Sequence, residues 1–340
     1  MNALTGAASF AVISGAAARS VLEADRTRVI ELVDTAYRLH GDGHAINPPS
    51  YFLRFPDMPN ARIIALPAAL RGDEPAAGLK WISSFPDNLG KGLPRASAVL
   101  VLNDGETGVP TACLESSVIS ASRTAASAAL AAVKLAGSRA ERGRVGYVGT
   151  GPIARHIHSY LLAAGWPVDE IHVHDLNAAR AADFGEWAAA SGGPAVTVHE
   201  RSEDLIPSCD VVVFATTAAK PHVTDPGLFA HHPLVLHVSL RDLSPEVLLD
   251  AVNVVDDVDH CLRAETSPHL TEQRTGSRDF VNATLHDVLT GAFTAPSDRT
   301  VVFSPFGLGV LDLVLARFVH AESLAKGSAV LIENFHEGIE

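Results

Sequence analysis

Cysteine is scarce in this chain, which has 340 residues and three cysteines, Cys113, Cys209 and Cys261. Their odd number and wide separation fit neither a disulfide framework nor the ligand spacing of a structural metal site. We therefore expect the thiols to be small buried residues, and we expect a cytoplasmic protein without a bound metal.

Long apolar runs and basic runs are also missing. No apolar run reaches the roughly 18 residues that a membrane-spanning helix needs, and the Ala- and Ser-rich stretch Met1–Ala18 lacks the cationic start of a signal peptide. The net charge of −13 repels phosphates on average. We expect no membrane and no nucleic acid among the partners.

The composition, with 47% hydrophobic and 19% charged residues, is that of a globular enzyme, and the length favours about two domains. The first region, residues 1–119, begins with helical spacing over Ser20–His40, which Gly41 ends. Turn-rich residues link Ala98–Leu102 to Thr111–Leu114, which predicts a hairpin. We expect an α+β domain with a mostly antiparallel sheet, whose other strands are Tyr51–Phe55, Ala61–Leu66 and Gly78–Ser83.

The pattern changes at Ser120, where an Ala-rich helix begins, and apolar strands then alternate with helices. Such alternation predicts an α/β fold with a Rossmann-type doubly wound parallel sheet over residues 120–311. The last helix, Gly309–Lys326, is expected to return to the first region, which residues 312–340 would complete. The expected strands are Val145–Val148, Ile171–His174, Ala195–His199, Val211–Ala215, Leu234–Val238, Val252–Val255 and Val301–Phe303.

A glycine-rich loop follows the first of these strands and opens a helix, as a dinucleotide fingerprint requires. Gly149 allows the tight turn, Gly151 lets the backbone approach a pyrophosphate, and Ala154 is small enough for the helix to pack on the strand. The helix N-terminus favours the phosphate charge. The loop as a whole comprises Gly149, Thr150, Gly151, Pro152, Ile153 and Ala154.

The next strand ends at Asp175, whose carboxylate is suited to the ribose hydroxyls. Because no arginine follows it directly and an acid repels a 2′-phosphate, we expect NAD rather than NADP as the cofactor. Small residues at the end of the expected strand Val211–Ala215 and just after it would let the backbone lie against the nicotinamide half of the cofactor. These residues are Ala215, Thr216 and Thr217.

Two cations lie inside apolar stretches that predict strands, Arg54 in Tyr51–Phe55 and Lys80 in Gly78–Ser83. An unpaired buried ammonium is costly, so Lys80 requires a partner or an anionic ligand. The alternative is a lysine that extends from an edge strand to water.

Two further charged residues occupy positions that indicate ligand binding. Arg123 falls in the first turn of the expected Ala-rich helix, where a cation is unfavourable unless it meets an anion. Asp242 follows the carboxyl end of an expected strand, the edge where ligands bind in open α/β sheets. Ser244 before Pro245 is sufficient to cap the next helix, so that Asp242 is not needed as a cap. The sixteen histidines show no metal-ligand spacing.

Together these residues resemble the ornithine cyclodeaminase/μ-crystallin family over nearly the whole chain. The resemblance rests on Gly78-Leu79-Lys80, the Val99–Leu114 hairpin, Ser122-Arg123-Thr124, the glycine loop and Asp242. Within the family, Asn47–Pro56, Lys80–Pro86 and Pro94–Ala98 look like the branch that makes 2,3-diaminopropionate for siderophores and peptide antibiotics.

That resemblance implies oxidation of N-(2-amino-2-carboxyethyl)-L-glutamate by NAD, and hydrolysis to 2-oxoglutarate and L-2,3-diaminopropionate. It implies that Arg54, Lys80 and Arg123 hold the substrate carboxylate, that Lys80 can polarise the reacting centre, and that Asp242 handles protons and activates water. It also implies homodimers formed through the first domain.

A tricarboxylate requires more cations than ornithine does, which makes Arg95 and Arg241 candidate contacts; for each, the alternative is a surface arginine. Three other functions stay open. They are an ornithine or lysine cyclodeaminase, an alanine dehydrogenase or ketimine reductase, and a μ-crystallin-like protein that holds a dinucleotide without turnover.

Overall fold

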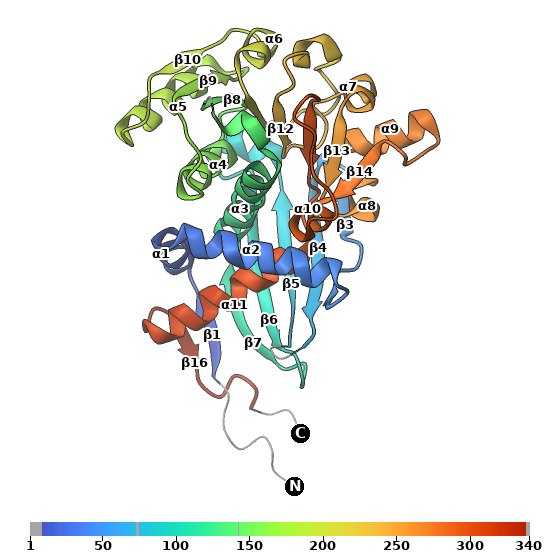
Figure 1. Ribbon diagram of the computed structural model, residues 1–340. Helices are drawn as coiled ribbons and strands as arrows, with labels where there is room; N and C mark the ends of the chain where they lie inside the picture. Colours follow the sequence, from blue (N-terminus) through green and yellow to red (C-terminus); the bar gives the residue numbers. More distant parts are fainter. Residues whose placement is uncertain (1–8, 73–74, 142, 338–340) are drawn as a thin grey trace. The chain divides into compact units, whose positions relative to one another are not determined.

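The chain, seen as a computed structural model in Figure 1, is described over residues 9–72, 75–141 and 143–337. It divides into two compact units. Unit 1 joins the N-terminal part, up to Arg123, to the C-terminal part from Leu308, and unit 2 comprises Thr124–Gly307. Each unit has its own sheet, so the two are described separately.

Unit 1 contains a mixed sheet in the order β16-β1-β7-β6-β5-β4-β2, with β3 on β4. Its neighbours are antiparallel except for β1 and β7, and the expected hairpin is β6–β7. Asp104 closes that hairpin turn by accepting from the Thr107 amide and hydroxyl. The strands are β1 (Phe10–Ile13), β2 (Ala45–Ile46), β3 (Tyr51–Phe55), β4 (Met58–Leu70), β5 (Ala76–Ser84), β6 (Ala96–Asp104), β7 (Pro110–Glu115) and β16 (Val330–Ile332).

The helices α1 (Gly15–Ala24), α2 (Arg26–Gly41) and α11 (Gly309–Ala325) cover one face of this sheet (Figure 1). The expected single helix over Ser20–His40 is wrong at its start, because Asp25 ends α1 and its side chain caps α2. A short 3-10 helix, η1 (Pro86–Lys91), separates β5 from β6.

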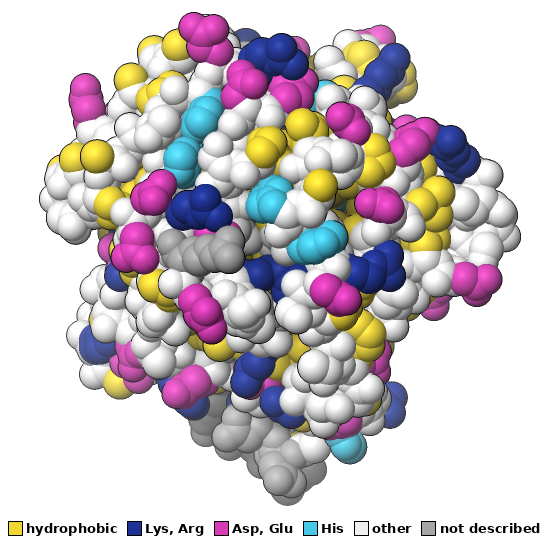
Figure 2. All heavy atoms as spheres, turned by 45° about the horizontal axis from the view of Figure 1, so that its top comes forward, with side chains coloured by type: hydrophobic (Ala, Val, Ile, Leu, Met, Phe, Trp, Pro, Cys, Tyr) yellow, Lys and Arg dark blue, Asp and Glu magenta, His cyan; other side chains and the backbone are white. Residues whose placement is uncertain are grey.

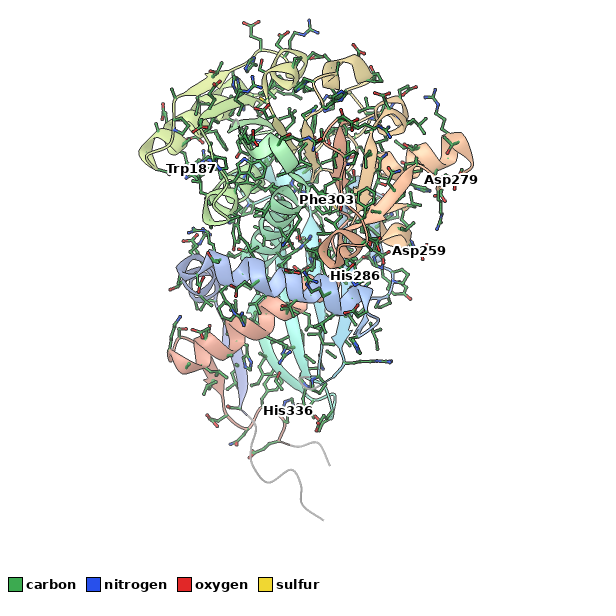
Figure 3. All side chains as sticks on the ribbon, viewed as in Figure 1. Trp187, Asp259, Asp279, His286, Phe303 and His336 are labelled. Atoms are coloured by element: carbon green, nitrogen blue, oxygen red, sulfur yellow. The ribbon has the colours of Figure 1, made fainter. Side chains whose placement is uncertain are left out.

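Unit 2 contains a sheet in the order β10-β9-β8-β11-β12-β15-β13-β14, parallel throughout. The predicted Rossmann-type doubly wound sheet is confirmed, although β14 was not expected. Phe303 in β15, labelled in Figure 3, is fully buried, as parallel strands covered on both faces require. The strands are β8 (Arg144–Val148), β9 (Glu170–His174), β10 (Val196–Val198), β11 (Val211–Phe214), β12 (Leu234–His237), β13 (Val252–Val255), β14 (Val281–Thr284) and β15 (Val301–Ser304).

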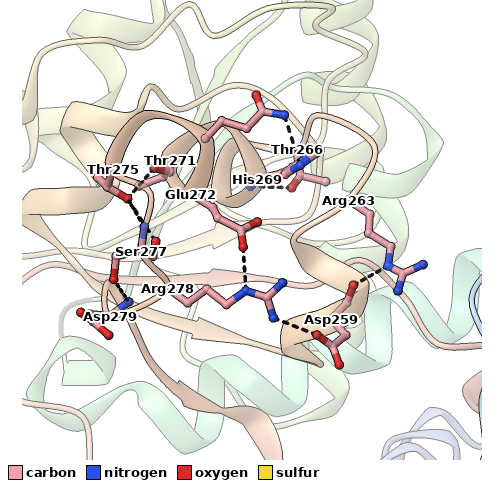
Figure 4. A network of polar contacts seen from close by, with 11 residues as sticks. Asp259, Arg263, Thr266, His269, Thr271, Glu272, Thr275, Ser277, Arg278 and Asp279 are labelled. Carbon is pink, nitrogen blue, oxygen red and sulfur yellow. Dashed lines mark hydrogen bonds and ion pairs between the residues drawn. The ribbon is translucent and has the colours of Figure 1, made fainter.

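Polar contacts tie the helices that follow β13 to one another (Figure 4). Arg278 donates to Glu272 at 2.6 Å and to Asp259 at 2.9 Å, so that one guanidinium joins α9 to α8. The α-helices that lie wholly in this unit are α4 (Pro152–Ala163), α5 (Ala178–Ala190), α6 (Ser202–Leu205), α7 (Pro245–Asp250), α8 (Val258–Cys261), α9 (Ser267–Thr275) and α10 (Leu285–Thr290).

The Ala-rich helix, α3 (Ser117–Leu135), starts before the expected Ser120. It is long and apolar enough to cross a membrane by length and composition, which corrects the expectation that no such stretch exists. However, 67% of its apolar window is buried inside the structure. This is the burial of a core helix.

Candidate functional site

The glycine loop lies where the strand order of unit 2 reverses, between β8 and β11. Gly149 has φ +87°, and a Cβ there would lie 2.7 Å from the Ala215 carbonyl oxygen that follows β11. Only glycine fits this position, because both the conformation and the close approach exclude a side chain. Ligands of open α/β sheets bind at such a reversal point.

Beyond Gly149 the loop is open. A Cβ on Gly151 would meet nothing within 4 Å, and Gly151 is the N-cap of α4. Ala154, in the first turn of α4, is fully buried. The unpaired amides of the first helical turn therefore border free space, which is the arrangement that binds phosphate groups.

Asp175 follows β9, the strand next to β8, and is tied to the loop. Its carboxylate accepts from the Thr150 amide at 2.9 Å and from the Thr150 hydroxyl at 3.0 Å. It also accepts from the Asn177 amide at 2.9 Å. The acidic side chain is thus fixed beside the glycine loop, at the end of the strand next to β8.

Asp242 lies in the turn after β12 and is fully buried. Its carboxylate accepts from Ser239 Oγ at 2.5 Å and from the Thr216 hydroxyl. Two histidines also face it: His222 Nε2 lies 3.1 Å from Oδ1, and His237 Nε2 lies 3.4 Å from Oδ2. The sequence singled out Asp242 and Thr216 but neither histidine.

The pKa of Asp242 results from opposing effects. Burial alone raises it, but hydrogen bonds from His222, His237 and Ser239 outweigh burial and hold the pKa of the carboxyl well below its usual range. Asp242 is therefore ionised at every pH near neutrality. It is a fixed negative charge that orients its donors.

Unit 1 brings two of the predicted cations to one carboxylate. Lys80 Nζ lies 2.5 Å from Asp312 Oδ2, and Arg123 Nε lies 3.5 Å from the same oxygen. Asp312 comes from α11 and is fully buried, as is Lys80 at 2% exposure. The partner that Lys80 requires is thus an internal acid, and the cluster retains one net positive charge.

This cluster changes the acid–base properties of Lys80. Burial is the main cause that lowers its pKa from 10.5 to about 8; Asp312 opposes this effect, and Arg123 adds to it. The expectation that Arg123 lies in the first helical turn is wrong. Because α3 begins at Ser117, Arg123 lies in the second turn, and the anion that it meets is Asp312.

Three arginines lie across one end of the same sheet. Arg54 of β3 is opposite Arg62 of β4, and Arg62 is opposite Ser84 of β5. The Ser84 hydroxyl accepts from Arg95 at 2.9 Å. Strand alternation places Arg54, Arg62 and Ser84 on the face that carries Lys80. We call Arg54, Arg62 and Arg95 the arginine row.

The row differs from the sequence expectation in one respect. Arg54 does not share the buried setting of Lys80, because it is exposed with its guanidinium over the Phe52 ring at 5.3 Å. Arg95 is partly buried, and burial lowers its pKa. Arg54 and Arg62 place two positive charges directly across the β3–β4 pair, an arrangement that is unfavourable unless an opposite charge lies close by.

Arg241 proves to have another role. It donates to the carbonyls of Glu265 and Ala264 at 2.8 and 2.7 Å and so holds a turn in which both residues have φ near +55°. The proposed carboxylate contact by Arg241 is therefore not supported. Within the described residues, no group of three or more His, Cys, Asp or Glu side chains is placed to hold a metal ion.

The remaining histidines and thiols are mostly structural. His158 bonds Tyr147 at 3.0 Å, and burial lowers its pKa to about 4. His172 and His199 bond each other at 2.9 Å beside β9. All three cysteines are free; Cys209 and Cys261 are buried, whereas Cys113 is only partly so. Figure 2 shows acidic and basic side chains intermixed over the face it presents.

A glycine loop at a sheet reversal, with an acid after the next strand, defines a dinucleotide-binding enzyme fold. The sequence pattern of the ornithine cyclodeaminase/mu-crystallin family matches residues 16–327. The chain belongs to this family, and the predicted resemblance is confirmed.

Three relatives illustrate its range. N-((2S)-2-amino-2-carboxyethyl)-L-glutamate dehydrogenase of Staphylococcus aureus is 27% identical over 86% of this chain and 89% of that protein. The Δ1-pyrroline-2-carboxylate reductase of Thermococcus litoralis, solved with NADH and L-proline, has a TM-score of 0.86 at 25% identity and covers 95% of this chain and 100% of that one. An archaeal alanine dehydrogenase dimer with bound NAD has a TM-score of 0.84 at 26% identity, covering 96% and 100%.

Proposed function

We propose that this chain oxidises N-(2-amino-2-carboxyethyl)-L-glutamate with NAD and hydrolyses the product to 2-oxoglutarate and L-2,3-diaminopropionate. The coarser statement, an NAD-dependent oxidoreductase of its family, follows from its relatives. The arginine row carries the finer proposal. This substrate has three carboxylates, and the row offers cations beyond Lys80 and Arg123.

NAD is the cofactor, as the sequence predicts, and the two solved relatives contain NADH or NAD. The loop residues Gly149 and Gly151 would bind its pyrophosphate, and Asp175 its ribose hydroxyls. When bound, the cofactor accepts hydride from the α-carbon of the glutamate moiety. Asp175, which no arginine directly follows in the sequence, disfavours a 2′-phosphate.

The residues of unit 1 would bind and orient the substrate. The Lys80–Arg123–Asp312 cluster has one surplus positive charge, which suits one carboxylate. Strand geometry separates Lys80 from Ser84 by four residues, about 13 Å at roughly 3.3 Å per residue. Carboxylates at two ends of an extended substrate therefore match cations at two positions of one sheet face. Fixing both ends orients the reacting C–H bond.

The lowered pKa of Lys80 suits proton transfer from the bridging amine of the substrate. A pKa of about 8 leaves a fraction of the amine neutral at physiological pH. Because Lys80 is only 2% exposed, it would take up the proton that the substrate nitrogen loses through a relay such as the Ser120 hydroxyl, 3.4 Å from its Nζ. Asp242, which stays ionised, would stabilise positive charge that develops in unit 2.

We also propose a cytoplasmic homodimer that serves siderophore or antibiotic synthesis. Trp81 and Val99 are opposite each other on the outer face of the unit 1 sheet, with 38% and 43% of their surface exposed. Apolar side chains of this size on an open sheet face favour association. The alanine dehydrogenase relative is a dimer, and three free thiols suit a reducing compartment.

Substrate selectivity tests this proposal. We expect kcat/KM for the tricarboxylate to exceed that for alanine, proline and ornithine by at least about 100-fold, because each satisfied carboxylate adds a charge-assisted contact. Arg95→Ala should lower kcat/KM for the tricarboxylate but not for alanine. Lys91→Ala, at an exposed lysine nearby in sequence, is the matched control.

Three results contradict the proposal. If kcat/KM for alanine equals that for the tricarboxylate, the chain is an alanine dehydrogenase. If ornithine yields proline and ammonia without net NADH, it is a cyclodeaminase. NAD binding without turnover of any of these substrates would indicate a binding protein of the μ-crystallin kind.

A further inference from the structure

We propose that His222 carries the proton in the hydrolytic half of this reaction, and that Asp242 acts through His222 as its positioning partner. This inference rests on the proposed oxidation to an imine, because only an imine requires water. It follows from which of the two side chains water can reach.

Exposure separates the two residues. The His222 side chain is 38% exposed, whereas Asp242 is 0% exposed. All four side-chain contacts of Asp242 come from within unit 2 and surround both of its carboxylate oxygens. A water molecule that attacks a substrate can approach the imidazole but not the carboxylate.

The backbone fixes His222 against Asp242. The amides of His222 and Val223 both donate to the Asp242 carbonyl, at 3.0 and 2.9 Å, and Ser244 donates back to Val223 at 3.0 Å. The ring of His222 also packs edge-on to Phe214, with centroids 6.5 Å apart. The His222–Asp242 contact is therefore set by two backbone bonds and a ring contact, and not by one flexible side chain.

Charge determines which ring nitrogen is basic. An ionised Asp242 holds the proton of His222 on Nε2, 3.1 Å from Oδ1, so that the lone pair is on Nδ1. His237 cannot replace it, because its ring is 1% exposed and bonded to Ser304 and to the Asp242 amide. The other ionisable groups close to His222 along the chain are Lys220 and Asp225.

In the hydrolytic step, His222 moves one proton from water to the imine nitrogen. Water oxygen bonds to the imine carbon, the carbon–nitrogen π pair moves to nitrogen, and one water proton passes to His222 Nδ1. His222 returns this proton to the nitrogen, which takes a second proton from solvent before the carbon–nitrogen bond breaks. The hydroxyl proton leaves to solvent as the carbonyl forms. The products are the keto acid and the free amine.

Kinetics of His222→Gln tests the assignment. Glutamine keeps a donor toward Asp242 but cannot carry the proton, so we expect kcat to fall at least about 100-fold. The pH dependence on the acidic side should flatten, the affinity for NAD should not change, and added imidazole should restore part of the rate. His44→Gln, at an exposed histidine of unit 1, is the control. A His222→Gln enzyme with the wild-type rate and pH profile would overturn the proposal.

A second measurement does not depend on the substrate. In nitrogen-15 histidine spectra, the signal that His222→Gln removes should show the Nε2–H tautomer in the wild type. Asp242→Asn should lose that preference. An Nδ1–H tautomer in the wild type refutes the assignment even if no substrate is turned over. Conversely, a wild-type enzyme that oxidises only alanine refutes the proposed substrate but not the role of His222. The His222→Gln variant is then assayed with alanine, because the imine formed from alanine is also hydrolysed by water.

Discussion

A Lys80→Met variant measures the cost of burying one ammonium group in unit 1. The folded protein holds the pKa of Lys80 at about 8, whereas the unfolded chain has the ordinary 10.5. Between these values the unfolded state binds more protons than the folded state. Stability therefore rises with pH through this window, and the penalty is fully present below pH 8.

The size of the effect follows from the two pKa values. Between pH 7 and pH 9.5 the contribution of Lys80 to the free energy of unfolding should rise by about 2 kcal/mol. Methionine has a similar length and no charge, so Lys80→Met should lack this rise. When the free energy of unfolding of Lys80→Met is subtracted from that of the wild type at each pH, the contributions of all other titrating groups cancel.

Urea unfolding at a series of pH values, followed by circular dichroism, gives the difference. Lys91→Met is the control, because Lys91 is exposed and should leave the pH dependence unchanged. If the curves of the wild type and Lys80→Met stay parallel from pH 7 to pH 9.5, Lys80 is not buried as the structure places it, and its role in proton transfer fails as well.

The following changes test other parts of the molecule. Gly149→Ala should lower stability by about 1–3 kcal/mol in thermal unfolding, because it combines positive φ with a clash against Ala215; an unchanged melting temperature contradicts this. Gly151→Ala, with open space at its Cβ, should keep the melting temperature but weaken NAD binding in calorimetry, and wild-type affinity would remove the loop from the pyrophosphate site. Asp312→Asn leaves the buried Lys80 and the partly buried Arg123 without this anion and should cost about 3–5 kcal/mol; a loss below about 1 kcal/mol in urea would show that the pairing is weak.

The fold and the cofactor loop were predictable because their signals are local. Alternating apolar runs predicted β8 to β13. The cofactor loop was recognisable because Gly149, Gly151 and Ala154 lie within six consecutive residues. The missed strand β14 lacks such a run, since only part of Val281–Thr284 is buried. The break at Asp25 was hidden by apolar residues that keep helical spacing on both sides.

The partners of the charged residues were not predictable, because they come from distant parts of the sequence. Asp312 is separated from Lys80 by 232 residues, and only the packing of α11 on the sheet brings them together. His222 and His237 were set aside among sixteen histidines. The one local signal that could have found them is their position. His237 ends β12 and His222 lies in the segment after β11, at the edge of the sheet where Asp242 lies.

The decisive measurement is the stoichiometry of turnover with purified protein, NAD and N-(2-amino-2-carboxyethyl)-L-glutamate. NADH is followed by absorbance, and the products are identified by mass spectrometry. We expect one NADH and one 2-oxoglutarate for each L-2,3-diaminopropionate released. Absence of NADH with this substrate, together with NADH and ammonia from alanine, would contradict it.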